Sequence, residues 1–363
     1  MDAGKYYALL RFEEASIALR AALKIDLIGQ IGTQKLELAQ FESLFGFTAQ
    51  GARTFAALLE VMEVLQRSNG IYSVSPRAAA TLSKDLPTSR MPYLSMGDSN
   101  ETDLLLEMLR GNFPDSSKPL YEHPDSQSPT LMDEPDAGRE IAYGLASRAR
   151  NFAEPLAKAI TPYANKAKIV ADLGAGSPWV LLACAEAMPR LQKVVLVDLP
   201  NGLQHAREMV SAPGIPHLEF CERDFFAEVP PADIYVLSNV SHDWLKDDYA
   251  KIITNVRDTI APNGTVCIHE PLLVSNWNSA AEWVRALWIA SYALTLYKLT
   301  KGNGTCYTRE EHNHVMERSG FLPVGEPVET CDGCTALFYK LAADATHVSH
   351  DRATQLQSQP ATR

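Results

Sequence analysis

The chain has 363 residues, of which 46% are hydrophobic, and a formal net charge of −11 at pH 7. This length allows one large or two medium domains, and the apolar fraction is enough for a sizeable core. Proteins that hold nucleic acid through its phosphates carry basic clusters, whereas no run of Lys and Arg here exceeds a pair. We therefore expect no nucleic-acid partner and a small-molecule ligand instead.

The sequence shows no signal for a membrane or for export. No apolar run approaches the roughly 20 residues of a membrane-spanning helix, and the segment Met1–Lys5 lacks the apolar core of a signal peptide. We expect a cytoplasmic protein whose cysteines are thiols. Cys331 and Cys334 form a C-x-x-C pair, but no second pair of ligands has the spacing of a zinc site. We predict no metal site.

A helical domain is predicted for residues 1–100. Apolar residues recur at intervals of three and four from Ala8 to Leu23, which is the period of a helix. Thr48 is a suitable N-cap for a further helix over residues 49–66.

A turn at Asn69-Gly70 follows this helix and predicts a small β-hairpin. Helices followed by such a hairpin are typical of winged-helix units, which often bind DNA. Basic and acidic residues balance in and beside the preceding helix, which carries Arg53, Arg67, Glu60 and Glu63. We therefore favour a role in packing or dimerisation.

The rest of the chain is predicted to form a connecting segment, an α/β domain and a tail. Residues 101–150 contain a stretch rich in Pro, Ser, Asp and Glu, which predicts a long loop or lid before a helix. In residues 151–342, helical segments separate apolar runs at 168–173, 193–198, 218–221, 233–238, 265–269 and 335–340. This alternation predicts a mostly parallel sheet covered by helices on both faces. Residues 343–363 are polar and predict a disordered tail.

The most informative motif follows the first of these apolar runs. The run ends near Asp172, and Gly174 and Gly176 come next, spaced by one residue. This pattern is typical of the first turn of a nucleotide-binding βα unit, where glycines let a ligand lie against the backbone. Pro178 and Trp179 stand where such loops have a third glycine. A helix can still start there, because proline suits a first helical turn.

Two further acidic residues lie at strand ends. Asp198 ends the next apolar run, 22 residues after Gly176, and an acid at this place accepts hydrogen bonds from ribose hydroxyls. Asp224 and Phe225 follow the third run, where a carboxylate can bind the amino group of adenine and a ring can pack against the base. Together these residues predict an adenosine-containing ligand.

These residues, in this order, resemble the S-adenosylmethionine (SAM)-dependent small-molecule O-methyltransferases with an N-terminal dimerisation domain. The resemblance extends from about residue 6 to residue 341, and its most specific motif is His242-Asp243-Trp244. It implies a Rossmann-like class I methyltransferase domain preceded by a winged-helix dimerisation domain, and therefore a homodimer.

The resemblance also implies how SAM is held. Gly174 and Gly176 would hold its methionine part, Asp198 would bind the ribose, and Asp224 with Phe225 would contact the adenine. Further residues expected at the cofactor are Asp172, Trp179, Leu199 and Ser238.

His242 is the expected general base. A histidine can take a proton from an acceptor hydroxyl because its ordinary pKa is near ~6.5, and the family has a histidine here. A histidine that only orients the turn before Trp244 is the other interpretation of this residue. Glu270, at another strand end, would orient His242. Asp243 is expected to cap the helix that follows.

The expected reaction is methyl transfer to a hydroxyl group of a small secondary metabolite. Asn239, Trp288 and Tyr292 are the predicted substrate-binding residues. Aromatic residues at helical spacing usually belong to a core, but in a pocket they favour a flat or cationic guest.

Two alternatives stay open. Some relatives bind SAM without transferring its methyl group, and use it for ring formation, for hydroxylation or for cyclisation of SAM itself. Pro178, Trp179, Ser238 in place of a lysine and Tyr307 in place of an arginine depart from the common pattern of the family and favour this alternative. The second alternative is a non-catalytic dimeric binding protein. It predicts a basic face on the winged-helix unit, which the sequence lacks.

Overall fold

A computed structural model describes residues 4–86, 89, 100–121, 128–210, 217–331 and 333–342. The chain divides into two compact units: Met1–Tyr121 with Leu272–Tyr307, and Glu122–Pro271 with Thr308–Arg363. The predicted boundaries differ from this division, because residues 272–307 join the first unit. The reason is that helix α12 (Ala280–Leu299) buries its apolar side chains in the core of the N-terminal helices. The predicted tail lies outside the described residues.

The first unit consists of helices and one hairpin. The helices besides α12 are α1 (Gly4–Lys24), α2 (Leu27–Ile31), α3 (Leu38–Phe45), α4 (Ala49–Val61), α5 (Pro76–Leu82) and α7 (Asn100–Leu109). Strands β1 (Leu65–Ser68) and β2 (Ile71–Val74) pair antiparallel. Asn69 and Gly70 between them have φ of 51° and 80°, as a tight hairpin turn requires. The predicted hairpin is therefore present, but α4 ends earlier than residue 66 because β1 begins at Leu65.

The second unit is built on an eight-stranded sheet in the order β5-β4-β3-β6-β7-β10-β8, with β9 paired to β10. The strands are β3 (Ile169–Leu173), β4 (Lys193–Asp198), β5 (Leu218–Glu222), β6 (Ile234–Ser238), β7 (Thr265–Pro271), β8 (Phe321–Pro323), β9 (Val328–Glu329) and β10 (Cys334–Leu341). Strands β3 to β7 run parallel, and β10 runs antiparallel to its neighbours. The prediction of a mostly parallel sheet is confirmed.

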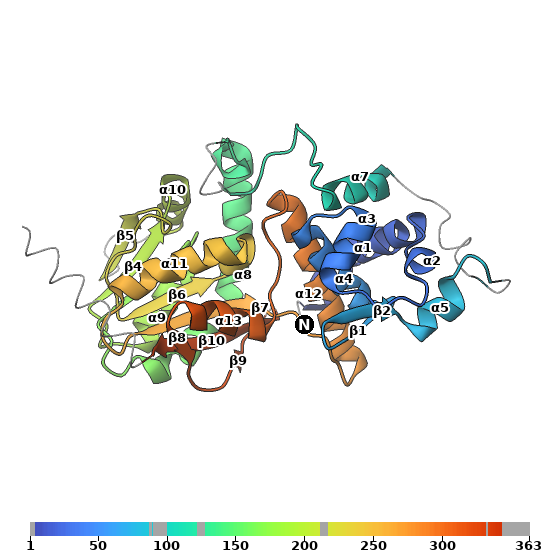
Figure 1. Cartoon of the computed structure of the whole chain (residues 1–363). Helices are drawn as coiled ribbons and strands as arrows, with labels where there is room; N and C mark the ends of the chain where they lie inside the picture. The colour runs from blue at the N-terminus through green and yellow to red at the C-terminus, as the bar shows by residue number, and fades with distance from the viewer. Residues whose placement is uncertain are drawn as a thin grey trace, which may run out of the picture. The chain divides into compact units, whose positions relative to one another are not determined.

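Helices cover both faces of this sheet (Figure 1). They are α8 (Pro135–Ile160), α9 (Trp179–Ala187), α10 (Pro200–Met209), α11 (Lys246–Thr259) and α13 (Arg309–Arg318). Buried side chains of α8, α9 and α10 form one core with every second residue of the strands, for example Val194 and Leu196. Figure 1 shows α11 and α13 on the other face of the sheet.

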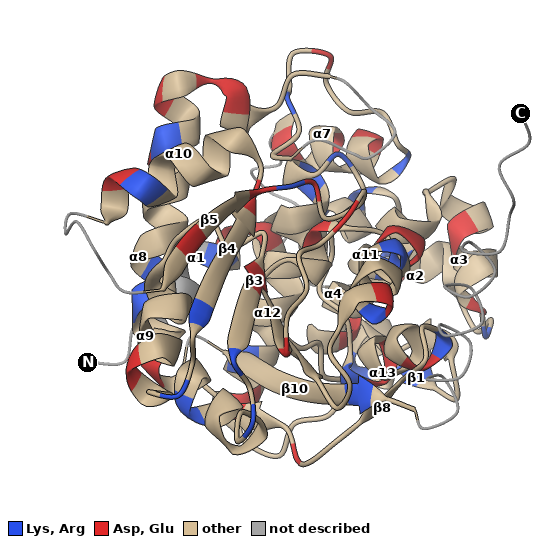
Figure 2. Cartoon of the chain, turned by 90° about the vertical axis from the view of Figure 1, so that its left-hand side faces the viewer, with Lys and Arg blue, Asp and Glu red and all other residues tan. Residues whose placement is uncertain are grey.

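The order of the strands reverses at β3, which has β4 on one side and β6 on the other. Open parallel sheets bind ligands at the carboxyl ends of the strands at such a point. Figure 2 shows Lys and Arg interspersed with Asp and Glu on the helices in view, so that no face in that view is uniformly basic. Within the described residues, none of the helices is both long and apolar enough to cross a membrane.

Candidate functional site

The loop between β3 and α9 places two glycines at the reversal point. Gly174 and Gly176 have φ of 65° and 56°, in the left-handed region that favours glycine. A Cβ on Gly174 would lie 3.1 Å from both Phe225 Cε1 and Val240 Cγ2, whereas one on Gly176 would meet nothing within 4 Å. The backbone at Gly176 is therefore open to the approach of a ligand.

Asp172 lies near the end of β3 and is only 2% exposed. Burial, followed by the charge of Asp198, raises the pKa of Asp172 well above its ordinary value. Its Oδ1 has no hydrogen-bond partner among the described residues. A buried polar atom without a partner costs free energy. The site therefore favours a ligand that brings a hydrogen-bond donor or a positive charge.

Asp198, at the end of β4, connects the glycine loop to α10. Its Oδ2 accepts a hydrogen bond from the Gly176 N–H and its Oδ1 one from the Leu199 N–H, both at 2.8 Å. Burial raises the pKa of Asp198, and these two hydrogen bonds oppose the shift. Leu199 contacts Asp198 through its main-chain N–H, whereas its side chain is exposed.

The loop after β5 carries Asp224 and Phe225. Asp224 Oδ1 accepts a hydrogen bond from the Phe226 N–H at 2.8 Å, and the Phe225 ring packs edge-on against Trp244 with centroids 6.0 Å apart. Asn255 of α11 donates through Nδ2 to the carbonyl oxygens of Phe225 and Phe226, both at 2.9 Å. Helix α11 thus fixes the loop that holds the predicted adenine contacts.

Trp179 is the first residue of α9, and Pro178 is its N-cap. The guanidinium carbon of Arg150, on α8, lies 3.9 Å from the centroid of the Trp179 ring, within the range of a cation–π interaction. The indole Nε1 is buried and has no hydrogen-bond partner among the described residues. The predicted contact of Trp179 with a cofactor stays a prediction, and Arg150 already covers one face of its ring.

His242 and Glu270 form a buried pair. His242 lies in the turn after β6 and Glu270 in β7, and Nδ1 of the histidine is 2.6 Å from Oε2 of the glutamate. The other oxygen, Oε1, accepts hydrogen bonds from the Val240 N–H, the Ser241 N–H and the Ser241 hydroxyl at 2.7 to 3.0 Å. Oε2 is thereby directed at Nδ1. With the proton on Nδ1, Nε2 is the basic nitrogen of the ring.

Within this pair, each group stabilises the charged form of the other. Burial alone lowers the pKa of His242, but the charges of Glu270 and Asp243 outweigh burial and raise it. Burial raises the pKa of Glu270, but its contacts with His242 and Ser241 lower it to about 2. Asp243 Oδ1 lies farther away, 3.8 Å from His242 Nε2, and burial raises the pKa of Asp243 to about 7. Glu270 is thus the principal ionic partner of His242.

Asp243 does not cap the helix that follows it. Helix α11 begins at Lys246 and has Leu245 as its N-cap residue, without a side-chain cap. The predicted role of Asp243 as a cap is wrong, because a short turn at Ser241–Asp243 and an extended Trp244 separate it from the helix.

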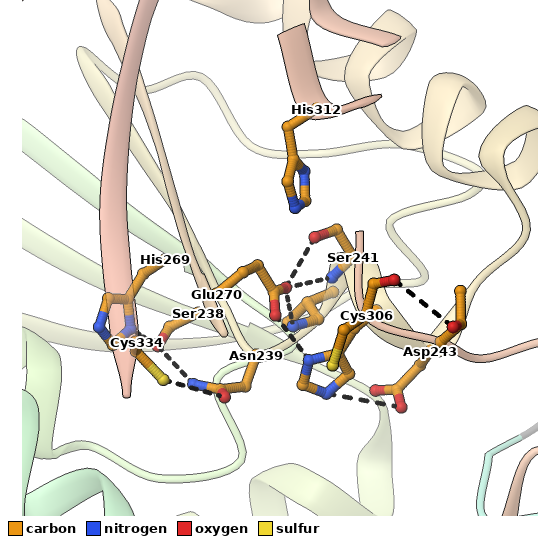
Figure 3. A network of polar contacts seen from close by, with 12 residues as sticks. Ser238, Asn239, Ser241, Asp243, His269, Glu270, Cys306, His312 and Cys334 are labelled. Carbon is orange, nitrogen blue, oxygen red and sulfur yellow. Dashed lines mark hydrogen bonds and ion pairs between the residues drawn. The ribbon is translucent and has the colours of Figure 1, made fainter. Parts of the chain in front are cut away.

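A second polar cluster fixes the end of β6 (Figure 3). Ser238 Oγ lies 2.8 Å from His269 Nδ1, and His269 Nε2 lies 2.7 Å from Thr330 Oγ1. Burial lowers the pKa of His269 to about 3, which keeps the ring neutral. Asn239, with φ of 56°, donates to Ser238 Oγ at 3.3 Å and accepts from Cys334 Sγ at 3.7 Å. Ser238 and Asn239 therefore hold each other in place.

Trp288 and Tyr292, the other predicted substrate residues, lie on α12 in the first unit. Their rings stack with centroids 6.0 Å apart and an interplanar angle of 2°. The guanidinium of Arg11 lies over the Tyr292 ring at 5.3 Å. Trp288 is 7% exposed and belongs to the core of its unit. Their role in substrate binding stays a prediction.

Within the described part of the chain, no group of three or more His, Cys, Asp or Glu side chains is arranged to hold a metal ion. The thiol of Cys331 donates to the carbonyl oxygen of Asn151 at 2.7 Å, and Arg148 donates to Cys334 Sγ at 3.3 Å. Both cysteines thus contact helix α8.

The residues of the second unit fit SAM. Its sulfonium and ammonium groups are cations, and the loop offers open backbone at Gly176 beside the buried carboxyl group of Asp172 and the half-buried one of Asp198. Gly174 lies against the side chains of Phe225 and Val240. The main-chain N–H of Val240 donates to the Glu270 carboxylate, which pairs with His242. The predicted cofactor loop and the predicted base therefore belong to one continuous set of contacts.

Sequence reasoning missed Asn255, Ser241 and His269. None of them belongs to a glycine loop or to a motif with a typical spacing, and Asn255 lies within a helix. Their contacts join residues that are 29 to 61 positions apart in the chain, for example Ser241 to Glu270 and His269 to Thr330. The only local signal was the position of His269 next to Glu270 at a strand end.

Comparison with known proteins shows which proteins the chain is similar to. Acetylserotonin O-methyltransferase from Gallus gallus is 29% identical over 154 residues, which cover 42% of each chain. The chain thus matches about two fifths of the length of such relatives. The crystal structure of an O-methyltransferase family 2 protein from Planctomyces limnophilus, in complex with apigenin, superimposes with a TM-score of 0.78 at 23% identity, covering 94% of this chain and 97% of that one.

A second solved structure, human N-acetylserotonin methyltransferase in complex with SAM, has a TM-score of 0.53 at 18% identity and covers 90% of this chain and 94% of that one. These structures share the fold. A family model described as an O-methyltransferase domain matches residues 131–322, more than half of the chain. The chain therefore belongs to this O-methyltransferase family, whose members use SAM.

Proposed function

We propose that this protein transfers the methyl group of SAM to a hydroxyl group of a small secondary metabolite, with His242 as the general base. The observation that carries the proposal is the buried contact of 2.6 Å between His242 Nδ1 and Glu270 Oε2, at the sheet edge that also carries the glycine loop. The family match supports the class of reaction.

The cofactor would be held by the loops after β3, β4 and β5. The open backbone at Gly176, next to the close-packed turn at Gly174, supports contact of these two glycines with its methionine part, and the carboxylate of Asp198 supports contact with the ribose hydroxyls. Asp224 and Phe225 would hold the adenine. Asp172, Trp179, Leu199 and Ser238 complete the proposed set.

The chemistry of the chain's own residues is proton transfer. SAM, when bound, supplies an electrophilic methyl group on a positively charged sulfur. His242 takes the proton of the acceptor hydroxyl at Nε2. Glu270 holds the proton of Nδ1 in place and stabilises the imidazolium that forms. Ser241 and Val240 keep the Glu270 carboxylate in the required orientation through its other oxygen.

We also propose a homodimer formed through the N-terminal helices. Large apolar side chains lie exposed on α1 and α7, with Phe12 and Leu104 about two fifths exposed. For the substrate we propose a flat aromatic hydroxyl compound, with Asn239, Trp288 and Tyr292 as contacts. The stacked rings of Trp288 and Tyr292 support this class. One relative is named for acetylserotonin, and a different protein of similar fold was crystallised with apigenin.

The test has two steps. Isothermal titration calorimetry with SAM and with S-adenosylhomocysteine measures cofactor binding, and absence of heat with both would contradict the proposal. Mass spectrometry of the cofactor after incubation with a panel of phenols and indoles then identifies the reaction. S-adenosylhomocysteine together with a product heavier by one methylene group supports methyl transfer. Intact SAM together with a chemically changed substrate, or the formation of methylthioadenosine, would identify a SAM enzyme that does not methylate.

A further inference from the structure

The first turn of α10 leaves room for the carboxylate of Asp198. Asp198 ends β4, and α10 begins two residues later at Pro200. The two carboxylate oxygens accept hydrogen bonds from Gly176 and Leu199 at 2.8 Å each, which hold the group in one place over this turn.

Gly202, the third residue of α10, lies directly against that carboxylate. A Cβ on Gly202 would be 2.5 Å from Asp198 Cγ, 2.6 Å from Oδ1 and 2.8 Å from Oδ2. Cβ atoms essentially never approach other heavy atoms within 3.0 Å. All three close atoms belong to one side chain, so a residue other than glycine would displace the Asp198 carboxylate or shift the turn that carries it.

The backbone of Gly202 does not itself require glycine. The φ of Gly202 is not positive, and the residue lies inside a regular helix. Alanine has a higher helix propensity than glycine, so the helix alone would favour alanine at this position. A glycine at position 202 is therefore explained by the space that the Asp198 carboxylate occupies, and not by the backbone conformation of the helix.

We propose that Gly202 is a positioning residue for recognition of the cofactor ribose. This role rests on the proposed function, in which Asp198 binds the ribose hydroxyls. A methyl group at position 202 pushes the carboxylate away from the Gly176 N–H, and therefore away from the open side of the glycine loop. The variant Gly202→Ala keeps its helix but loses affinity for the cofactor.

The experiment compares single and double variants by calorimetry with S-adenosylhomocysteine. Gly202→Ala should bind at least about tenfold more weakly than the wild type, the size expected for a lost charge-assisted hydrogen bond. Gly144→Ala is the matched control. Gly144 is a glycine inside helix α8, and a Cβ there would meet nothing within 4 Å, so its affinity should stay unchanged.

A double-mutant cycle tests whether Gly202 acts through Asp198. In an Asp198→Ala background the clash is gone, and adding Gly202→Ala should change the affinity less than about twofold. The melting temperature of unliganded Gly202→Ala shows that the variant is folded at the temperature of the titration.

Two results would overturn the role of Gly202. One is binding by Gly202→Ala within about twofold of the wild type. The other is an equal loss of affinity in the wild-type and Asp198→Ala backgrounds. If the wild type itself binds no S-adenosylhomocysteine, the proposed function fails, and the role of Gly202 fails with it. If the wild type binds S-adenosylhomocysteine and Gly202→Ala binds it equally well, the role of Gly202 is refuted and the proposed function is not.

Discussion

At the scale of residues, the ionisation of Glu270 controls what His242 can do. The carboxylate lies 2.6 Å from Nδ1, inside a site that is almost completely buried, with His242 3% and Glu270 1% exposed. Electrostatic interactions are stronger in such surroundings than in water. The pair therefore determines both the proton affinity of the ring and the nitrogen that is left to accept a proton.

Replacement of His242 by Ala is expected to reduce turnover by about 10² or more while the affinity for S-adenosylhomocysteine stays the same. Steady-state kinetics and calorimetry measure the two effects separately. Removing one partner of a buried ion pair costs about 3–5 kcal/mol of stability, so His242→Gln, which keeps a donor near Glu270, is the companion variant. Full activity in both variants would show that His242 is not the base.

Replacement of Glu270 by Gln is expected to move the acid limb of the pH profile of kcat/KM. In the wild type the pKa of His242 is raised, so activity is lost as the pH falls through a value above ~6.5. Without the negative charge, burial dominates and lowers that pKa, and the limb moves to lower pH. Asp243→Asn is the control. Its oxygen is 3.8 Å from the ring, so it should move the limb less, and an equal shift would contradict the assignment.

At the scale of elements, α11 determines the shape of the loop after β5. Asn255 of α11 donates hydrogen bonds to the carbonyl oxygens of Phe225 and Phe226. Because the Phe225 ring also contacts the position of Gly174, the helix, the loop and the glycine turn form one connected structure. A change within α11 should therefore affect cofactor binding at a distance.

Asn255→Ala is expected to weaken binding of S-adenosylhomocysteine by roughly tenfold and to cost about 1–2 kcal/mol of stability, because two carbonyl groups lose their donor. Calorimetry measures the affinity, and hydrogen exchange of residues 224–228 reports the loosened loop. Thr254→Ala is the matched control, since its hydroxyl bonds only within α11. Unchanged exchange in Asn255→Ala would show that other contacts fix the loop.

At the scale of the whole molecule, two units with separate cores make up the chain, and the residues proposed to hold the cofactor all lie in the second. A ligand that binds only the folded state raises the free energy of unfolding by about 2.7 kcal/mol at a hundred times its Kd. The effect of the cofactor on stability should therefore begin in the second unit.

Calorimetric thermal unfolding with saturating S-adenosylhomocysteine is expected to raise the melting temperature by several degrees. If the two units unfold in separate transitions, the ligand should shift the transition of the second unit more than that of the first. Gly144→Ala should respond as the wild type does, and Asp198→Ala should respond less. An equal response of Asp198→Ala would remove Asp198 from the proposed cofactor site.

The secondary structure of the second unit followed closely from the sequence. The apolar runs correspond to β3, β4, β5, β6, β7 and β10 within two residues, because strands of a sheet that helices cover on both faces are largely apolar along their whole length. The strands β8 and β9 were not predicted, since they have only three and two residues and leave no periodic pattern. Residues 272–307 were assigned to the wrong neighbours, because an apolar helix does not indicate which core it enters.

By itself, the sequence determined the order of the elements and the chemical residues at the strand ends. Asp172, Asp198 and His242 could be located because strands of a parallel sheet end at a shared edge. Only the tertiary structure decided that Glu270 faces Nδ1 of His242 and that the carboxylate of Asp198 lies on Gly202. These arrangements depend on distances and side-chain directions set by packing between separate elements, and no local pattern of residues encodes them.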